Sequence, residues 1–181
     1  HLHREGSRGR GIRKPDVVVS GDQEAGGAGR WVIDRLANLR VHHRGNGADG
    51  KHYWLTPPAL YAALNAEFHF DFDPCPYPLP AGFDGLTCEW GLSNYVNPPF
   101  GSIIHEGRKK GPTAWARKAL SEHAKGKSVV LVYPIDKWVL MLLGALGSEV
   151  RNLGDVRWLS IEDGRPGKGT GRHIAAFILR P

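Results

Sequence analysis

The chain has 181 residues, a formal net charge of +6 and a pI near 9.5. This length suits one domain with a single core plus a tail, and it excludes two domains of ordinary size. The longest apolar run, residues 138–146, is far shorter than the roughly 20 residues of a membrane span, so a membrane helix is excluded too. The basic balance is typical of proteins with a polyanionic partner, although proteins without such a partner also show it.

The first 50 residues differ in composition from the rest of the chain. They are rich in glycine and arginine, and residues 1–51 hold ten Lys or Arg against six Asp or Glu. We expect residues 1–50 to be a flexible basic N-terminal tail, with one short helix at residues 31–39, where apolar residues recur at helical spacing. Two interpretations of the tail stay open: a basic arm that contacts phosphates, or an inert extension.

Residues 51–181 have the composition of a folded domain, which opens with a predicted helix. Residues 56–68 predict this helix, with Thr56 as its N-cap and Pro57 in its first turn. Four residues at helical spacing make its expected buried stripe: Leu60, Ala63, Leu64 and Phe68. The next residues, 68–72, alternate apolar and polar side chains and predict a strand.

Proline-rich loops follow two of the predicted strands at their carboxyl ends. Four prolines between positions 74 and 80 forbid regular structure directly after residues 68–72. Residues 94–96 form the next predicted strand, and Asn97-Pro98-Pro99-Phe100 makes the loop after it stiff. Each of these two predicted strands is therefore followed directly by a loop that its prolines keep out of regular secondary structure.

The second half of the domain predicts helices and strands in alternation. Residues 113–124 predict a helix, and residues 128–133 are a continuous apolar run typical of a strand that helices cover on both faces. Asp136 is suited to cap the apolar helix that follows. Three closing strands are predicted at residues 150–153, 156–161 and 173–179, with a Gly-, Lys- and Arg-rich loop at residues 163–172.

This alternation predicts an α/β protein with a three-layer Rossmann-like fold. We expect a mixed, mostly parallel sheet with a C-terminal antiparallel strand pair. Such sheets bind ligands outside the carboxyl ends of their strands, and the two proline-rich loops are expected at that edge.

The segment Asn97-Pro98-Pro99-Phe100 carries the chemistry that points most directly to a function. An amino group conjugated to a ring is a poor nucleophile, and a site that methylates it needs acceptors for its two N–H bonds. The Asn97 side chain and the Pro98 carbonyl can supply them. Pro99 stiffens the turn, and Phe100 offers a ring face to a base taken out of its stack. An ordinary turn is the alternative, because Asn-Pro is a common turn opener.

Residues 53–179 resemble one family, the phage-type or Dam-like DNA N6-adenine methyltransferases. The resemblance rests on five segments in a fixed order: Trp54-x-Thr56-Pro57, Phe70-Asp71-Phe72-Asp73-Pro74, Asp84-Gly85-Leu86 with Trp90, Asn97-Pro98-Pro99-Phe100, and Asp136-Lys137-Trp138. It implies S-adenosyl-L-methionine as cofactor, double-stranded DNA as partner, and methyl transfer to the N6 amino group of adenine. It also implies a phage or prophage origin, a methyltransferase domain at residues 51–181, and the cytoplasm of a bacterial host.

The resemblance also assigns roles to single residues. The implied catalytic residues are Asn97, Pro98, Pro99 and Phe100. The implied cofactor-binding residues are Trp54, Thr56 and Pro57 for the donor's carboxylate, Asp73 and Pro74 for its methionine portion, and Asp84 for the amino group of its adenine, with Asp71 as a further donor-binding residue. Two alternatives stay open: Asp71 and Asp73 as a pair of solvated acids at a strand end, and Trp54 as a core residue. The Gly-rich turn of many donor-binding domains is absent from the sequence, with Pro76, Pro78 and Pro80 in its place.

Other functions remain open on the same residues. A protein-glutamine or RNA adenine methyltransferase would need the same amine chemistry, and a non-catalytic nucleic-acid-binding module would keep the basic surface alone. Recognition of a DNA sequence would rest on the loops at residues 101–112 and 164–172, whose basic residues could equally form a solvated face. The sequence fixes neither the oligomeric state nor the biological role, such as protection from restriction.

The chain contains two cysteines, Cys75 and Cys88. No secretion pattern opens the sequence, so we expect free thiols in a reducing compartment, in keeping with the cytoplasm. Together with His105 and His123 these cysteines match no spacing of paired zinc ligands, and no metal site is expected.

Overall fold

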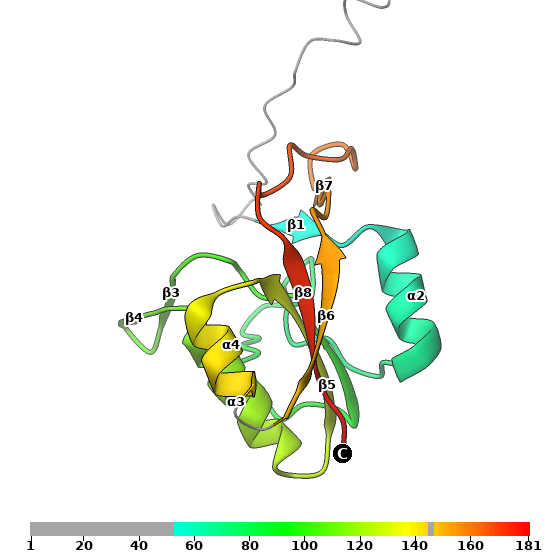
Figure 1. Ribbon diagram of the computed structural model, residues 1–181. Coiled ribbons are helices and arrows are strands. Elements are labelled where there is room, and N and C mark those ends of the chain that lie inside the picture. Colours follow the sequence, from blue (N-terminus) through cyan, green and yellow to red (C-terminus); the bar gives the residue numbers. More distant parts are fainter. Residues whose placement is uncertain (1–52, 145–146) are drawn as a thin grey trace, which may run out of the picture. The chain divides into compact units, whose positions relative to one another are not determined.

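A four-stranded sheet forms the centre of the domain (Figure 1). The computed structural model describes residues 53–144 and 147–181, which belong to one compact unit of the chain, His42–Pro181. The strands run in the order β2 (Ser93–Val96), β5 (Ser128–Pro134), β8 (Ile174–Leu179) and β6 (Glu149–Gly154). The helix expected at residues 31–39 lies outside the described residues.

The pairing within this sheet corrects the predicted fold class. Strands β2 and β5 are parallel, whereas β8 pairs antiparallel with both β5 and β6. The prediction of a three-layer Rossmann-like fold with a mostly parallel sheet is therefore wrong. The physical reason is that β8 returns between β5 and β6, and that residues 68–72 do not add a second parallel strand.

Residues 68–72 contribute only one bridge, between Phe72 and Asn94. Helix α2 (Pro58–Phe68) ends at His69, whose φ of 51° turns the chain sharply. Asn65 Oδ1 then accepts a hydrogen bond from the Phe70 N–H at 2.8 Å, which satisfies that backbone donor outside any strand. The alternation of apolar and polar residues at positions 68–72 thus reflects how their side chains pack, and these residues form no regular strand.

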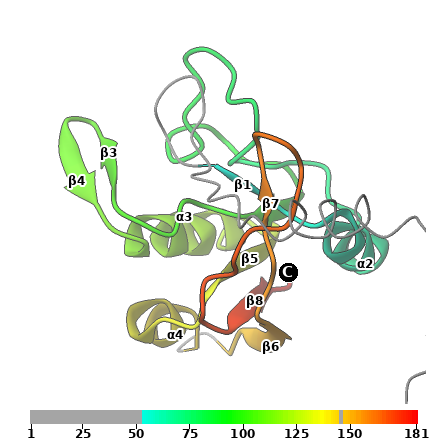
Figure 2. The ribbon, with the colours of Figure 1, turned by 90° about the horizontal axis from the view of Figure 1, so that it is seen from above.

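Helices pack on both faces of the sheet (Figure 2). Helices α3 (Thr113–His123) and α4 (Lys137–Gly144) cover one face, with Trp115, Val139 and Leu143 against the side chains of Leu131 and Phe177. Helix α2 covers the other face. Its Leu64 and Phe68 are buried as expected, but Ala63 is exposed. Because both faces are covered, β5 is buried along nearly its whole length, which explains its continuous apolar sequence.

Two small sheets complete the domain. Strand β1 (Trp54–Leu55) pairs antiparallel with β7 (Leu159–Ser160), which is shorter than the strand predicted at residues 156–161. Strands β3 (Ile103–His105) and β4 (Arg108–Lys110) form an antiparallel hairpin where a loop was expected. Glu106 and Gly107 make its turn, both with positive φ.

The helix caps agree only in part with the sequence. Asp136 Oδ1 accepts hydrogen bonds from the N–H groups of Trp138, at 2.8 Å, and Val139, at 3.3 Å, so it caps α4 as predicted. Thr56 does not cap α2: the N-cap residue is Pro57, with no side-chain cap, and Pro58 opens the helix. The Thr56 hydroxyl instead lies 2.7 Å from Tyr95 Oη.

Candidate functional site

The segment Asn97–Phe100 follows β2 at the edge of the sheet where β5 also ends. Because these two strands are parallel, their carboxyl ends lie side by side, and the tip of β5 carries Tyr133. Trp54 of β1 and Thr56, which follows that strand, reach the same edge, and their atoms contact the Asn97 side chain. Residues more than 40 positions apart in the sequence thus meet here (Figure 1).

The Asn97 side chain is half-buried, and its amide has a defined orientation. Its Nδ2 lies 3.5 Å from the carbonyl oxygen of Trp54 and 3.3 Å from Thr56 Oγ1, at the long end of hydrogen-bonding distances. A carbonyl oxygen can only accept a hydrogen bond, so the amide nitrogen must face Trp54. This leaves Asn97 Oδ1 as an acceptor with no hydrogen-bond partner among residues 53–144 and 147–181.

The Thr56 hydroxyl links Asn97 to a buried tyrosine. Thr56 Oγ1 lies 2.7 Å from Tyr95 Oη, and Tyr95 is 2% exposed on β2. Burial raises the pKa of Tyr95, so its phenol stays protonated at neutral pH. The chain of contacts Tyr95, Thr56 and Asn97 therefore ties the side chain of Asn97 to the core.

Pro98, Pro99 and Phe100 form a corner that is anchored from β5. Pro98 is buried, Pro99 is exposed, and the Pro98 carbonyl accepts no hydrogen bond from any residue that the structure describes. Tyr133 donates its hydroxyl to the Phe100 carbonyl at 2.8 Å, and burial raises the pKa of Tyr133 to about 12, which keeps that donor protonated. The corner is thus held at both ends, while Asn97 Oδ1 and the Pro98 carbonyl oxygen have no hydrogen-bond partner among the described residues.

The ring of Phe100 is half-buried between two aromatic neighbours. It meets the ring of Tyr133 edge to face at 5.2 Å and that of Trp158 at 5.4 Å between centroids. Trp158 is 3% exposed, and its indole N–H has no hydrogen-bond partner within the described part of the chain. A buried donor without a partner is costly, and it lies beside the ring that was expected to stack on a base.

The predicted donor-binding residues separate into different local roles. Asp71 is exposed, and its carboxylate accepts hydrogen bonds from the N–H groups of Leu92, at 3.1 Å, and Ser93, at 2.9 Å. Asp71 therefore holds the start of β2. Trp54 is half-buried, and Gly167 lies so close that a Cβ there would be 2.5 Å from the Trp54 ring. Packing under the loop before β8 accounts for this tryptophan.

Asp73 is the acidic residue with the most unusual surroundings. Its Oδ1 accepts a hydrogen bond from the Cys75 N–H at 2.7 Å, while burial raises its pKa from 3.8 to about 6. Pro74 is buried, and Gly85 approaches it closely: a Cβ on Gly85 would lie 1.9 Å from the Pro74 carbonyl oxygen. This contact fixes the Asp73 loop against the Asp84 loop.

Asp84 has a partner that the sequence did not reveal. Its Oδ2 lies 2.8 Å from His105 Nδ1 in β3, and its Oδ1 accepts a hydrogen bond from the Leu86 N–H at 2.9 Å. The side chain of Asp84 is 42% exposed and that of His105 is 12% exposed. Asp84 therefore anchors the β3–β4 hairpin in addition to any contact with a ligand.

The start of α2 offers few backbone donors to an anion. Pro57 and Pro58 have no N–H, and the Tyr61 N–H donates to the Pro57 carbonyl at 3.1 Å. Of the first helical turn, the N–H groups of Ala59 and Leu60 are left for a ligand. Two N–H groups at a helix N-terminus suit a carboxylate.

The two cysteines and two histidines considered as zinc ligands do not form a cluster. Both cysteines are free, and no group of three or more His, Cys, Asp or Glu within the described ranges could hold a metal ion. His123 lies at the far end of α3, where its Nδ1 is 3.2 Å from the Lys127 carbonyl oxygen.

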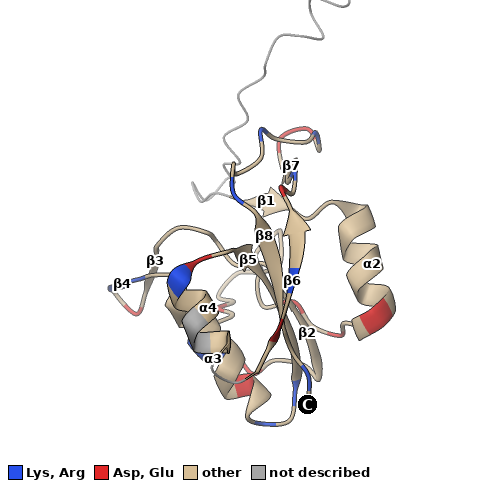
Figure 3. Cartoon of the chain, viewed as in Figure 1, with Lys and Arg blue, Asp and Glu red and all other residues tan. Residues whose placement is uncertain are grey.

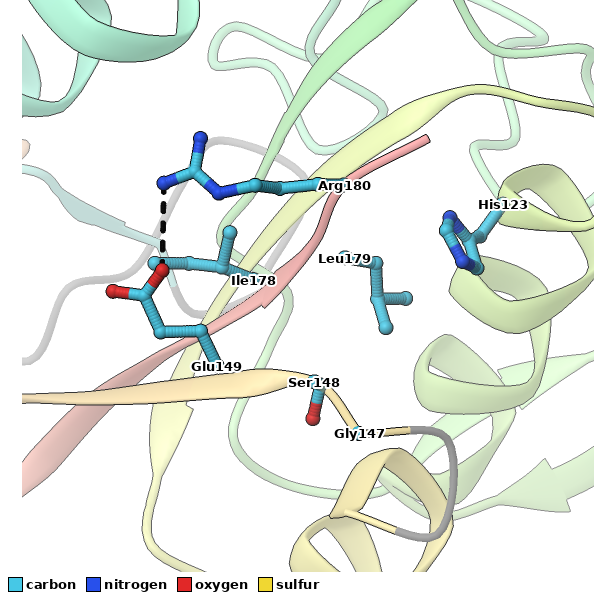
Figure 4. A pocket seen from close by; sticks show the side chains of 7 residues that line it. All are labelled: His123, Gly147, Ser148, Glu149, Ile178, Leu179 and Arg180. Atoms are coloured by element: carbon cyan, nitrogen blue, oxygen red, sulfur yellow. Dashed lines mark hydrogen bonds and ion pairs between the residues drawn. The ribbon is translucent and has the colours of Figure 1, made fainter.

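A hollow of about 280 Å³ lies where the end of β8 meets the segment that enters β6 (Figure 4). Its lining comes from the end of α3, the segment that enters β6 and the end of β8: His123, Gly147, Ser148, Glu149, Ile178, Leu179 and Arg180. Two of its lining residues, Arg180 and Glu149, form an ion pair of 3.4 Å. None of the residues predicted to bind a ligand lines this hollow.

No protein-family model, no curated protein and no solved structure matches the chain. The residues that the structure describes contain no helix that is long and apolar enough to cross a membrane.

Proposed function

We propose that the chain transfers a methyl group from S-adenosyl-L-methionine to the N6 amino group of adenine in double-stranded DNA. The observation that carries this proposal is the pair of unpaired acceptors, Asn97 Oδ1 and the Pro98 carbonyl oxygen, on a corner anchored by Thr56 and Tyr133. Two acceptors are what the two N–H bonds of a planar amino group require.

The residues of the corner would act by position and electrostatics. Asn97 Oδ1 and the Pro98 carbonyl would accept the two N–H bonds of N6 and raise the electron density on that nitrogen. Hydrogen-bonding groups that the fold holds in place stabilise a transition state effectively, because they need no reorganisation as charge develops. The half-buried Phe100 ring, which Trp158 contacts edge to face, would support the base after its release from the stack.

The residues around Asp73 fit the methyl donor. The carboxylate uses one oxygen for the Cys75 N–H, which leaves Oδ2 for the ammonium group of the methionine portion. The Ala59 and Leu60 N–H groups suit the donor's carboxylate, and Asp84 keeps lone pairs for the amino group of its adenine. When bound, the donor would supply an electrophilic methyl on a sulfonium; its C–S electron pair would stay on sulfur, and the N6 proton would pass to water.

A transfer assay with purified protein tests the proposal. The full chain is incubated with S-adenosylmethionine labelled in its methyl group and, in separate reactions, duplex DNA, RNA and a protein mixture. We expect label in adenine-containing duplex DNA. Label in RNA or protein without DNA would indicate a different methyltransferase, and binding of the donor without transfer to any acceptor would indicate a non-catalytic module.

A further inference from the structure

The β3–β4 hairpin begins three residues after Phe100 and forms a sheet of its own. Figures 1 and 2 both show it projecting outward beside α3, away from the central sheet. Most of this projecting hairpin lies outside the core, next to the candidate site. What each of its two faces contacts therefore indicates its role.

The inner face of the hairpin attaches it to the domain. Ile103 packs against the core on the side of α3, and His105 binds Asp84 at 2.8 Å. Because side chains alternate along a strand, Ile104 between them faces the other way. Ile104 is 73% exposed, and its partner across the ribbon is Lys109. The outer face thus presents an isoleucine beside a lysine.

The hairpin is also strongly basic. Arg108, Lys109 and Lys110 follow one another on β4, with Glu106 in the turn as the hairpin's acid (Figure 3). Within residues 53–144 and 147–181, none of the three cations forms an ion pair, and Glu106 lies 3.8 Å from His105. Unpaired cations next to one exposed apolar side chain complement a polyanion that also offers apolar groups.

We propose that the β3–β4 hairpin is the element that binds duplex DNA beside the site of methyl transfer. Lys109, which lies on the same face as Ile104, would contact phosphates, and Ile104 would pack against base edges in the major groove, which admits a two-stranded ribbon and displays thymine methyl groups. Duplex RNA has a deep, narrow major groove that side chains cannot read, so the fit is to DNA. This inference rests on the proposed function for its choice of substrate.

Binding of the full chain to a fluorescently labelled DNA duplex, followed by anisotropy over a range of salt concentrations, tests the hairpin. Lys109→Ala should reduce the slope of log K against log salt by about 0.9, because one phosphate contact is lost. Ile104→Ala should weaken binding about tenfold with the slope unchanged, because it removes apolar and not ionic contact.

Two matched controls lie away from the hairpin. Leu92→Ala truncates an equally exposed apolar side chain, at 74%, and Lys125→Ala removes a lysine at the far end of α3 while Lys118 and Lys127 stay paired with Glu122. Both controls should bind as the unmodified chain does. All four side chains are exposed or half-exposed, so the unfolding midpoints should stay within experimental scatter.

The possible results separate this inference from the proposed function. If Ile104→Ala and Lys109→Ala bind DNA as tightly as the controls, with the same salt slope, the inference is wrong even where methyl transfer proceeds. If they lose binding but no acceptor is methylated, the hairpin binds DNA and the proposed function fails. Equal or tighter binding of duplex RNA overturns the choice of DNA.

Discussion

The amide nitrogen of Asn97 lies 3.3 Å from the hydroxyl oxygen of Thr56, a residue 41 positions earlier in the chain. The same hydroxyl lies 2.7 Å from Tyr95 Oη, so one threonine connects the candidate catalytic residue to a buried ring. The contact orients the amide such that its oxygen remains for a ligand. Four predictions follow from this arrangement and its surroundings.

Asn97→Ala should lower methyl transfer to duplex DNA by about a hundredfold or more, because it removes a positioned acceptor. The substitution truncates a half-buried side chain at the sheet edge, so the unfolding midpoint should change little. Asn152→Ala, at an exposed asparagine of β6, is the control and should retain the full rate. Equal rates for Asn97→Ala and the unmodified protein would remove Asn97 from catalysis.

Thr56→Val should lower the transfer rate about tenfold, because valine keeps the shape of the side chain but lacks the hydroxyl that orients the Asn97 amide. We expect this effect to act only through Asn97. A double-mutant cycle checks this: Thr56→Val on top of Asn97→Ala should cost nothing further in rate. Tyr95 loses its hydrogen bond as well, so the free energy of unfolding should fall by about 1 kcal/mol. Additive rate losses would mean that the two residues act independently.

Asp73 should make folding stability depend on pH in a defined direction. Its pKa is about 6 in the folded protein against 3.8 as the ordinary value, because burial disfavours the charge. The contribution of Asp73 to stability is therefore fully present below pH 3.8 and is lost as the pH rises through 6. Asp73→Asn should be more stable than the unmodified chain at pH 8, by at most about 3 kcal/mol, and no more stable near pH 4.

Urea unfolding of both proteins at these two pH values measures the difference, and other titrating groups cancel in the comparison. A gap that stays constant with pH would contradict the raised pKa. The same variant should bind S-adenosylmethionine about tenfold or more weakly, because an amide cannot balance an ammonium charge. A variant that is more stable but binds the donor less well is the expected signature of a functional carboxylate.

Gly85→Ala should displace the loops that carry Asp73 and Asp84. The new Cβ would meet the Pro74 carbonyl oxygen at 1.9 Å, so the backbone must move, at a cost of about 1–3 kcal/mol in unfolding free energy. Donor affinity should fall with it. Gly101→Ala is the matched control, since nothing lies within 4 Å of a Cβ there. Equal stability of the two variants would show that Gly85 does not pack tightly against the Pro74 carbonyl.

The parts of the fold that depend on local pattern could be predicted. The apolar run of β5, the helix α3 and the Asp136 cap of α4 were each predicted within one or two residues, because periodicity and capping are properties of neighbouring residues. The sheet topology could not be predicted in this way. The antiparallel return of β8 between β5 and β6 depends on contacts between distant segments, which no local pattern encodes.

The candidate site shows the same division. The corner at Asn97 was predicted, because prolines restrict the backbone wherever they occur and the strand before it was clear. The partners that give the corner its surroundings were not predicted: no local pattern marks Tyr95, Tyr133 or Trp158 as a neighbour of Asn97 or Phe100. His105 was considered only as a zinc ligand, and its contact with Asp84 was not predicted. Thr56 was expected at a helix cap, where Pro57 stands, and its contact with Asn97 joins residues 41 positions apart, which no local pattern encodes.

The most direct measurement is mass analysis of nucleosides from duplex DNA incubated with S-adenosylmethionine and either the unmodified chain or Asn97→Ala. We expect N6-methyladenine with the unmodified chain. With Asn97→Ala its amount should fall a hundredfold or more, because the variant lacks one positioned acceptor. Unmodified adenine in both samples, from protein shown to be folded, would contradict the proposed function.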